Sequence, residues 1–552
     1  MEPSQRNKWL LLISSLGVLT LLAAAAFQET VLLEWREIQA HAQTDEGPLP
    51  IMLRQVVNPT LGLADRCVSC HVAMAPGEEN VRGPGIAPHP AVVHDPSEYG
   101  CTVCHGGQGR ATRKEDAHGT VEFWPSPMLP GVMSQAGCGT CHIATGVPRR
   151  ERLDAARATF ERLDCLTCHR MDGRGGTLRP GSGGMEAPDL SRAAIAGYDH
   201  DWYEGHARTA AAVENGPWTT SFGAVGEADR TDIDLYLSTR VGAPQLVAAK
   251  SVFNSMGCLG CHKVSGVGGD EGPDLTRGGE KDPGRADFSA VRGSRTLSAW
   301  FAEHMRAPSA LVAGSLMPAV AASDAEIDAL TFYTLSLRRR DVPGSYLPRD
   351  RMRVSRFGER EFTSDGATVF GAFCTGCHGR DGQGSRGPGT PVPSVTNPDF
   401  LAVAPDSLIR ETILRGRPGR PMRAWGDRSA GLNAVDVSAI VSYLRGASGI
   451  AAAPDARPAR WVNGDRTRGE RLYAAACSGC HGPTGEGAEG PALNNPVLQQ
   501  FATDTYLVET IARGRRGTLM QSFVEPSTIH RTFARPEIED IVTFIRSWGG
   551  RP

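Results

Sequence analysis

The stretch Cys477-Ser-Gly-Cys480-His481 places two cysteines one turn apart and follows them directly with a histidine. The same Cys-x-x-Cys-His motif occurs seven times and uses all 14 cysteines of the chain. We number the motifs 1 to 7: Cys67, Cys70 and His71; Cys101, Cys104 and His105; Cys138, Cys141 and His142; Cys165, Cys168 and His169; Cys258, Cys261 and His262; Cys374, Cys377 and His378; and Cys477, Cys480 and His481.

This spacing is typical of the covalent attachment of c-type haem. Two thiols on one turn reach the two vinyl groups of a porphyrin, and the histidine that follows points its imidazole at the iron. A zinc ribbon or a redox-active thiol pair does not require a histidine after every Cys-x-x-Cys. The sequence therefore predicts seven covalently bound haem c groups with iron, and the chain resembles the multihaem c-type cytochromes.

Length and composition indicate several loop-rich domains. The chain has 552 residues, of which 65 are glycine and 38 are proline, and aromatic residues make up only 6%. The formal net charge of −3 gives no global attraction to nucleic acid, so we expect no nucleic-acid partner.

Residues 1–30 are predicted to form a signal-anchor or transmembrane helix. An uncharged run from Trp9 to Phe27 is close to the length that spans a bilayer. Arg6 and Lys8 precede this run, which favours an N-terminus inside the cell. We therefore expect a single-pass protein of the cytoplasmic membrane with its bulk facing the periplasm or the cell exterior, and cleavage near Ala24–Ala26 is the alternative. Residues 31–60 are predicted as a juxtamembrane helix and linker, with Trp35 at the membrane interface.

The spacing of the motifs divides the rest of the chain. Motifs 1 to 3 are crowded into residues 61–150, which resemble compact, loop-rich trihaem modules. Around motifs 4 to 7, an aromatic residue precedes the first cysteine by four or five positions, and a helix with one apolar face closes each unit. The aromatic residues are Phe160, Phe253, Phe370 and Tyr473, and the closing helices fall within 233–239, 327–337, 437–446 and 538–548.

These four units resemble class I cytochromes c. The resemblance implies a mostly α fold with four such domains in tandem, at residues 151–243, 244–340, 361–448 and 464–552. Stretches rich in proline and arginine at 341–360 and 449–463 are predicted to be linkers, and the charge run at 338–341 is predicted to lie on a solvated face.

Each haem iron needs a second axial ligand or keeps an open position. His89, His94 and His118 are the distal candidates of the trihaem module, with Met74, Met128 and Met133 as possible thioether ligands. The class I resemblance implies distal methionines at Met317, Met422 and Met520. It also implies that the carbonyls of Pro188, Pro273 and Pro491 accept a bond from the motif histidines, which would fix the imidazole tautomer.

The unit of motif 4 departs from the class I pattern. Aligning Trp202 with Trp300 places Thr219 where Met317 stands. His206, His200 and Met185 are candidates for its sixth ligand, and a helix-packing role for His206 and His304 is the alternative. A ligand from another module or an open position is also compatible with the sequence.

Arginines crowd both methionine loops, at Arg415, Arg417, Arg420 and Arg423 and at Arg513, Arg515 and Arg516. They are interpreted either as partners of haem propionates or as a basic rim that steers an acidic redox partner.

The layout of an anchor, a trihaem module and class I units resembles cytochrome c subunits of bacterial quinol-oxidising cytochrome b/Rieske-type complexes. The resemblance implies electron transfer between such a membrane complex and a soluble cytochrome or a terminal oxidase or reductase, without a catalytic residue of its own. The alternatives are a multihaem reductase of a small nitrogen or sulfur oxyanion, with an open haem at motif 4, and an extracellular electron conduit.

Overall fold

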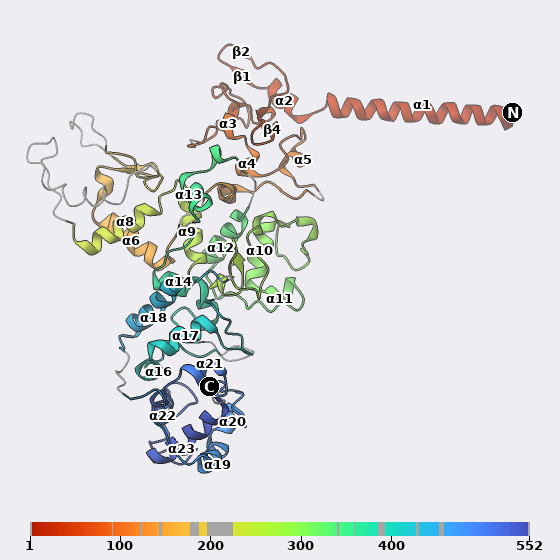
Figure 1. The fold of residues 1–552 in the computed structure, drawn as a ribbon. Coiled ribbons are helices and arrows are strands. Elements are labelled where there is room, and N and C mark those ends of the chain that lie inside the picture. Colours follow the sequence, from red (N-terminus) through yellow and green to blue (C-terminus); the bar gives the residue numbers. More distant parts are fainter. Residues whose placement is uncertain are drawn as a thin grey trace, which may run out of the picture. The chain divides into compact units, whose positions relative to one another are not determined.

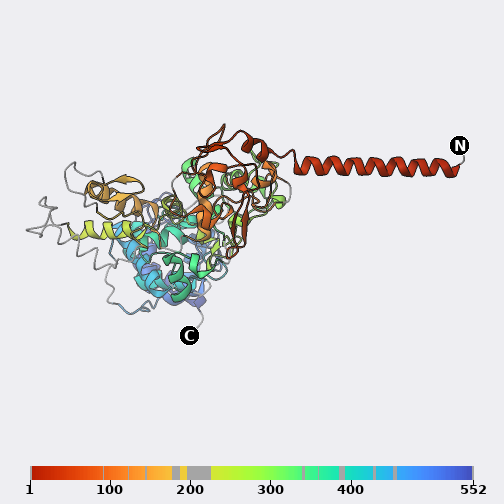
Figure 2. The same cartoon turned by 90° about the horizontal axis from the view of Figure 1, so that it is seen from above.

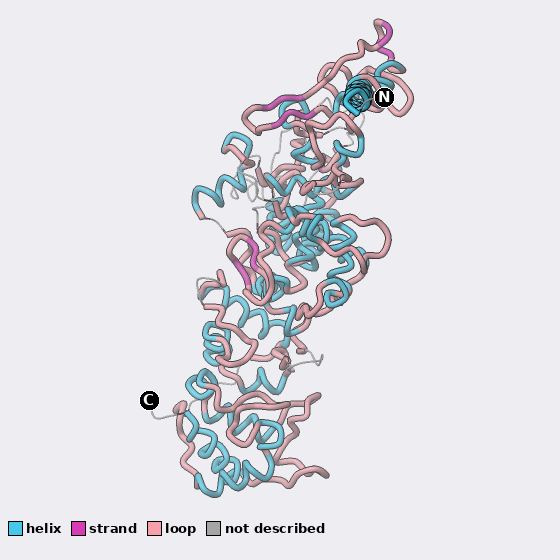
Figure 3. The backbone as a smooth tube through the Cα atoms, turned by 90° about the vertical axis from the view of Figure 1, so that its right-hand side faces the viewer, coloured by secondary structure: helices cyan, strands magenta, loops and turns pink. Residues whose placement is uncertain are grey.

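The computed structural model is mostly helical (Figure 1). It describes residues 3–90, 92–121, 124–142, 146–176, 187–195, 225–338, 342–358, 360–384, 392–426, 430–451 and 457–549. Its contacts divide the chain into two compact units: Met1–His142 with Arg277–Met352, and Ile143–Thr276 with Arg353–Pro552. Within the described residues, strands form only two-stranded hairpins and loops are abundant (Figure 3).

Helix α1 (Pro3–Thr30) is apolar and none of its spanning window is buried in the protein. Its segment Ser4–Gln28 is long enough, by length and composition, to cross a membrane. Two perpendicular views show that α1 extends away from the remainder of its unit (Figures 1 and 2).

The juxtamembrane helix predicted within residues 31–60 is present, and it is not continuous with helix α1. Residue Leu33 is extended (φ −98°, ψ 134°), so α2 (Glu34–Ala40) is a separate helix. Trp35 is 5% exposed and packs inside the protein, which corrects its prediction as an interfacial anchor.

The part of the first unit that carries motifs 1 to 3 has only short elements, as predicted. Its hairpins are β1 (Gln43–Thr44) with β2 (Gly47–Pro48), and β3 (Val56–Asn58) with β4 (Leu63–Asp65). Its helices are η1 (Cys67–Ser69), η2 (Val72–Met74), α3 (Pro96–Tyr99), α4 (Thr102–His105), α5 (Lys114–His118) and η3 (Gly131–Thr140). Two small clusters of buried apolar residues, around Val72 and around Val56, form its core. Side chains alone therefore make only a small core in this module.

Three further helices of the first unit are α10 (Leu297–Arg306), α11 (Pro308–Leu311) and α12 (Asp324–Ser336), preceded by η6 (Gly278–Glu280) and η7 (Pro283–Arg285) and followed by η8 (Gly344–Tyr346). Helix α12 begins with a capping box between Ser323 and Glu326. It packs on η3, where a side chain at Gly139 would collide with the carbonyl of Ser336.

The segment predicted as a linker over 341–360 contains helix α13 (Arg349–Phe357). The preceding charge run is not wholly solvated, because Arg338 is buried and donates from Nε to the carbonyl of Leu335 at 3.0 Å. In the second predicted linker, the backbone N–H groups of Trp461 and Val462 donate to the Asp504 carboxylate at 2.7 and 2.9 Å.

The second unit repeats one helix crossing. The first and last helices pack together as α6 (Arg150–Arg162) with α8 (Glu227–Ser238), α14 (Gly366–Phe373) with α18 (Ala434–Ser448), and α19 (Arg466–Ala476) with α23 (Arg535–Arg546). An aromatic pair fills each crossing at 5.2 to 5.5 Å between ring centroids: Phe160 with Tyr236, Phe370 with Tyr443, and Tyr473 with Phe544. These contacts confirm the predicted aromatic positions and closing helices for motifs 4, 6 and 7, whereas Phe253 of motif 5 and the helix predicted to close its unit belong to different units.

A small residue four positions before the aromatic lets two of these helix pairs approach closely. A side chain added at Gly366 would collide with the carbonyl of Ala439, and one at Gly469 would collide with the carbonyl of Asp540. The remaining elements of the unit are η4 (Cys165–Thr167), β5 (Arg170–Met171), β6 (Arg174–Gly175), α9 (Pro244–Phe253), η5 (Cys258–Gly260), β7 (Lys263–Val264), β8 (Val267–Gly268), α15 (Thr375–His378), α16 (Pro398–Val403), α17 (Asp406–Arg415), α20 (Ser478–His481), α21 (Pro496–Phe501), α22 (Asp504–Arg513) and η9 (Ser547–Gly549).

Candidate haem-attachment sites

All seven motifs adopt one helical turn. In every motif the backbone N–H of the histidine donates to the carbonyl of the first cysteine, at 2.8 to 3.0 Å. This bond holds two thiols and one imidazole on a single short turn. All 14 cysteines are free of disulfide bonds. Among the described residues, no group of three or more histidine, cysteine or acidic side chains could bind a metal ion by itself.

Four motif histidines donate from Nδ1 to a proline carbonyl. The bonds join His169 to Pro188 at 2.8 Å, His262 to Pro273 at 2.9 Å, His378 to Pro393 at 3.0 Å and His481 to Pro491 at 2.9 Å. Three of these partners were predicted, and Pro393 was missed. Fixing Nδ1 as the donor leaves Nε2 free to coordinate a metal, as a c-type haem requires.

Glycine makes room for this bond in motifs 5 and 7. A Cβ at Gly272 would lie 2.5 Å from Cε1 of His262, and one at Gly490 would lie 2.8 Å from Cε1 of His481. Each glycine directly precedes the proline whose carbonyl accepts the bond, so the imidazole lies against bare backbone.

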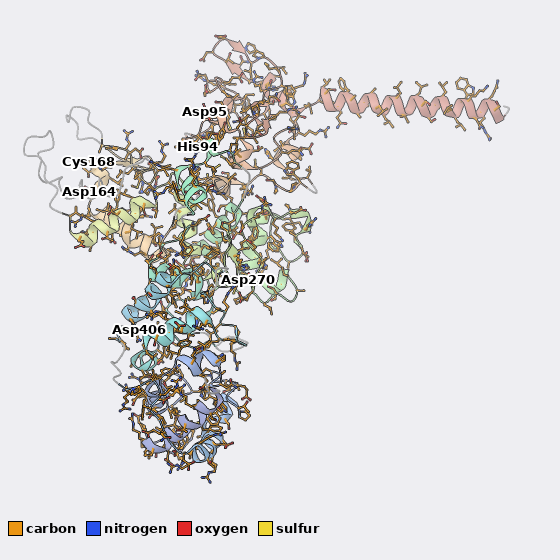
Figure 4. All side chains as sticks on the ribbon, viewed as in Figure 1. His94, Asp95, Asp164, Cys168, Asp270 and Asp406 are labelled. Atoms are coloured by element: carbon orange, nitrogen blue, oxygen red, sulfur yellow. The ribbon has the colours of Figure 1, made fainter. Side chains whose placement is uncertain are left out.

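In the trihaem module the structure places two of the three motif histidines beside a spare histidine. The ring centroids of His89 and His105 are 6.2 Å apart, and those of His94 and His142 are 5.8 Å apart. Imidazole–metal bonds of about 2 Å place two rings about 6 Å apart across a shared metal. Both pairs therefore have the spacing that bis-histidine ligation needs. Figure 4 labels His94 just before α3.

The third spare histidine lies near motif 1. Burial and the neighbouring imidazole of His118 both lower the pKa of His71. His118 therefore lies near motif 1, and its role as the distal ligand of that motif stays a prediction.

Asp65 is a buried residue of the module that the sequence reasoning missed. Its carboxylate accepts from the backbone N–H groups of Cys101 and Thr102 at 2.7 and 2.8 Å and from Thr102 Oγ1 at 2.9 Å. Asp65, at the end of the β3–β4 hairpin, thereby caps the turn of motif 2. A contact between segments so far apart in the chain cannot be predicted from a local sequence pattern.

Neighbouring motifs touch one another. Cys67 raises the pKa of the Cys101 thiol, so motif 1 lies close to motif 2, and Cys377 raises the pKa of the Cys261 thiol, so motif 6 lies close to motif 5. A side chain at Gly257, just before motif 5, would collide with the backbone nitrogen of Gly376 in motif 6. A side chain at Gly137, just before motif 3, would collide with the carbonyl of Cys104 in motif 2.

The predicted methionine ligands lie on half-buried loops. The N–H of Arg417 donates to the carbonyl of Met422 at 2.7 Å, and the N–H of Arg515 donates to that of Met520 at 2.6 Å. The two loops are therefore the same turn. Met317 is also half-buried and belongs to the first unit, whereas motif 5 belongs to the second.

The ligand candidates of motif 4 lie outside the described residues. These are His206, His200 and Met185, together with Thr219. In the neighbouring domain, His304 stacks on Trp300 with ring centroids 4.8 Å apart, which agrees with a packing role for that histidine.

Most arginines of the methionine loops bind groups of the chain itself. Ion pairs join Arg415 to Glu411, Arg423 to Asp270, Arg513 to Glu509 and Arg516 to Asp399. Arg515 donates to the Tyr506 hydroxyl at 2.7 Å. Arg417 has a lowered pKa because burial outweighs the nearby Tyr506, and an anionic propionate would relieve that cost.

The two C-terminal domains contact each other through equivalent elements. Helix α16 packs on α22, and its counterpart α21 packs on α17 (Figure 1). Asn397 donates from Nδ2 to the carbonyl of Arg516 at 3.0 Å, and Asn495 donates to that of Pro418 at 3.2 Å.

Comparisons with known proteins agree with this repeat. The family described as cytochrome C oxidase, cbb3-type, subunit III matches residues 361–444 and 464–545, and the cytochrome c family matches residues 246–338. The protein is thus a multihaem c-type cytochrome. Its cytochrome c domains, which carry covalently bound haem c, stand in tandem behind an apolar N-terminal helix.

Two relatives show the extent of the similarity. The Cbb3-type cytochrome c oxidase subunit FixP of Bradyrhizobium diazoefficiens is 30% identical over 176 residues, 30% of this chain and 56% of that subunit. The subunit CcoP of Helicobacter pylori (strain 52) is 24% identical over 191 residues, 34% of this chain and 60% of that subunit. The chain therefore spans little more than half of the relatives' length.

Among solved structures, a chain of the reducing HAO-like protein complex of Kuenenia stuttgartiensis is similar to part of this protein. It is 20% identical and has a TM-score of 0.24, over 34% of this chain and 96% of that chain. Similarity at this TM-score supports no inference about fold or function.

Proposed function

We propose that the protein is a membrane-anchored heptahaem cytochrome c, facing the periplasm, that conducts electrons between redox proteins. All seven motifs would attach haem c, whose iron supplies reversible one-electron transfer when bound. The direct contacts between neighbouring motifs carry this proposal. A conductor needs closely spaced cofactor sites. Gly137, just before motif 3, lies against the Cys104 carbonyl of motif 2, and Gly257, just before motif 5, lies against Gly376 of motif 6, so motifs come together within each unit.

The ligands proposed for the two units differ in kind. In the first unit, His118, His89 and His94 would be the distal ligands opposite His71, His105 and His142, respectively. In the second unit, Met422 and Met520 would serve motifs 6 and 7. Methionine ligation raises the potential relative to bis-histidine ligation, so electrons would run from the trihaem module to the C-terminal domains.

The partners we propose follow from the layout and from the relatives. A quinol-oxidising cytochrome b/Rieske-type membrane complex would be the electron donor. A soluble cytochrome or a terminal oxidase would be the acceptor, which the similarity of residues 361–545 to cbb3-type oxidase subunits supports. Helix α1 would hold the protein at the membrane where the donor works.

The test uses oxidised full-length protein mixed with quinol-containing membranes from the same cells. Reduction of the protein should be fast and should stop when an inhibitor of cytochrome b/Rieske-type quinol oxidation is added. Reduction that proceeds unchanged with the inhibitor would refute the proposed donor. A carbon monoxide titration of the native protein separates the reductase alternative, because a carrier with seven six-coordinate sites binds none.

A further inference from the structure

The buried face of helix α2 lies against the haem-attachment turn of motif 1. The two buried residues of this helix are Trp35 and Gln39, which stand four positions apart and therefore share one side of it. Helix α2 packs on η1, and the fully buried Gln39 donates from Nε2 to the carbonyl of Ser69, between Cys67 and Cys70, at 2.8 Å. The side of α2 that carries Trp35 is thus the side that faces motif 1.

Further buried hydrogen bonds hold α2 in this position. Gln39 Oε1 accepts from the N–H of Met52 at 2.9 Å and from Arg54 Nη1 at 2.8 Å. The N–H of Arg54 donates to the Ser69 hydroxyl at 2.9 Å, and this hydroxyl donates to the carbonyl of Arg54 at 2.7 Å. The helix is therefore fixed to the turn of motif 1 and forms one wall of that site.

The indole of Trp35 brings a polar atom to this wall that the chain leaves unpaired. Trp35 is 5% exposed, and its Nε1 is buried without a hydrogen-bond partner among the described residues. By contrast, an oxygen of the chain accepts from the indoles of Trp124, Trp300 and Trp461 at 2.9 to 3.0 Å. An indole N–H can only donate, and burying it without an acceptor costs free energy. An acceptor from outside the polypeptide is therefore expected at Trp35.

Cationic side chains at the same site favour an anionic acceptor. The guanidinium of Arg36 lies over the Trp35 ring, with its Cζ 5.1 Å from the ring centroid. Arg66, directly before Cys67, donates from Nη1 to the carbonyl of Arg110 at 2.8 Å, but its buried Nε has no partner within the described part of the chain. A carboxylate forms the strongest hydrogen bonds with donors of this kind, and each haem c carries two propionate carboxylates.

We propose that Trp35 is a haem-binding residue of motif 1, whose indole N–H donates a hydrogen bond to a propionate of the haem attached at Cys67 and Cys70. The inference rests on the proposed function, in which this motif attaches haem c. Hydrogen bonding around a haem is one of the ways in which a protein tunes its potential. Donation to the propionate reduces the negative charge that favours the ferric state, so the Trp35 bond raises the potential of this haem.

The first test is a potentiometric titration of full-length Trp35→Phe, because phenylalanine keeps an aromatic ring and lacks the N–H. One haem should shift to lower potential while the other six keep theirs. Trp124→Phe is the matched control in the same module, because its indole already donates to the carbonyl of Ser126, and all seven potentials should stay unchanged. Unchanged potentials in Trp35→Phe with full haem content, or the same shift in both variants, would overturn the inference.

Resonance Raman spectroscopy reports on the propionate itself, because the bending frequency of a haem propionate depends on the hydrogen bonds that it accepts. Trp35→Phe should change this frequency for one haem, and Trp124→Phe should change it for none. If Trp35→Phe does not fold, a cryo-electron microscopy structure of the unaltered holoprotein decides the question. Trp35 Nε1 should then lie about 2.7–3.2 Å from a propionate oxygen, and an ordered water or a lipid headgroup in its place refutes the contact.

Haem content distinguishes the two levels of the argument. Peptide mass mapping shows whether Cys67 and Cys70 carry haem. If they do not, the proposed function fails at motif 1. If they do and both the potential and the propionate frequency ignore Trp35, only the present inference fails.

Discussion

Asn397 and Asn495 make the same contact in opposite directions across the two C-terminal cytochrome domains. Each asparagine lies four residues after the proline that binds the motif histidine, and each donates to a carbonyl four residues before the predicted methionine ligand. Such reciprocity is the property of an isologous, two-fold-like interface. It fixes the methionine loops of motifs 6 and 7 against each other.

Replacing both asparagines with serine should loosen this interface without removing the helix caps. Serine is a good N-cap, but it is too short to reach the opposite carbonyl, and each lost bond should cost about 1 kcal/mol. Hydrogen–deuterium exchange at residues 416–422 and 514–520 should increase. Asn433→Ser is the control, because the hydrogen bonds of Asn433 stay within its own helix. Equal exchange in the control and the double variant would contradict the interface account.

His94→Ala should open one coordination position in the trihaem module. The imidazole of His94 lies opposite His142, so its loss leaves the iron of motif 3 five-coordinate. We expect one of the seven haems to gain carbon monoxide binding and to change from low spin to high spin. His304→Ala serves as the comparison, because that histidine stacks on Trp300. If neither variant binds carbon monoxide, the pairing of His94 with His142 is wrong.

Gly490→Ala should push the imidazole of His481 away from Pro491. The added Cβ would lie 2.8 Å from Cε1 and 2.9 Å from Nδ1 of that ring, and overpacking of this kind costs about 1–3 kcal/mol. We expect a lower melting temperature of the last domain and a shifted potential of its haem. Gly479→Ala, where the new Cβ meets nothing within 4 Å, should leave both measurements unchanged. Matching behaviour of the two variants would count against the role of Gly490.

The contact between α6 and α8 should weaken in acid through Asp232. Burial raises the pKa of this carboxyl. Hydrogen bonds from Thr159 at 2.8 Å and Arg152 at 2.5 Å together lower the pKa by more than burial raises it, so the net pKa lies below its usual value. The stabilisation is therefore complete above the unfolded pKa of about 4 and is lost as the pH falls through the lower folded value. The effect should be about 1 kcal/mol, because Arg152 is partly solvated.

Thermal unfolding between pH 2 and pH 7, roughly this window, measures the effect. Asp232→Asn should be less stable than the original protein at neutral pH and should lose the acid-dependent step. Asp229→Asn, whose pair with Arg162 is exposed, should unfold like the original protein throughout. If Asp232→Asn shows the same acid-dependent loss of stability as the original protein, that loss comes from another group and the account of Asp232 is wrong.

Structural features that recur at fixed distances from each Cys-x-x-Cys-His motif could be predicted from the sequence. The aromatic residues Phe160, Phe370 and Tyr473, the closing helices and three of the proline partners recur at steady distances from each motif, and the structure confirms them. Pro393 was not predicted as a partner of His378, because it lacks the Gly-Pro-x-Leu sequence that surrounds Pro273 and Pro491.

Contacts between distant segments could not be predicted in this way. Asp65 reaches motif 2 from 36 residues away along the chain, so no spacing rule identifies it. The pairing of the spare histidines depends on how short loops fold in three dimensions. The break before α2 also differs from the sequence pattern, because burial of Trp35 inside the protein outweighed helix continuity.

Intact-mass spectrometry of the purified full-length protein tests the central claim most directly. The account predicts a mass that exceeds the polypeptide by seven haem groups, with every Cys-x-x-Cys-His peptide carrying one. A mass equal to that of the bare polypeptide, or one that accommodates fewer than seven, would contradict it.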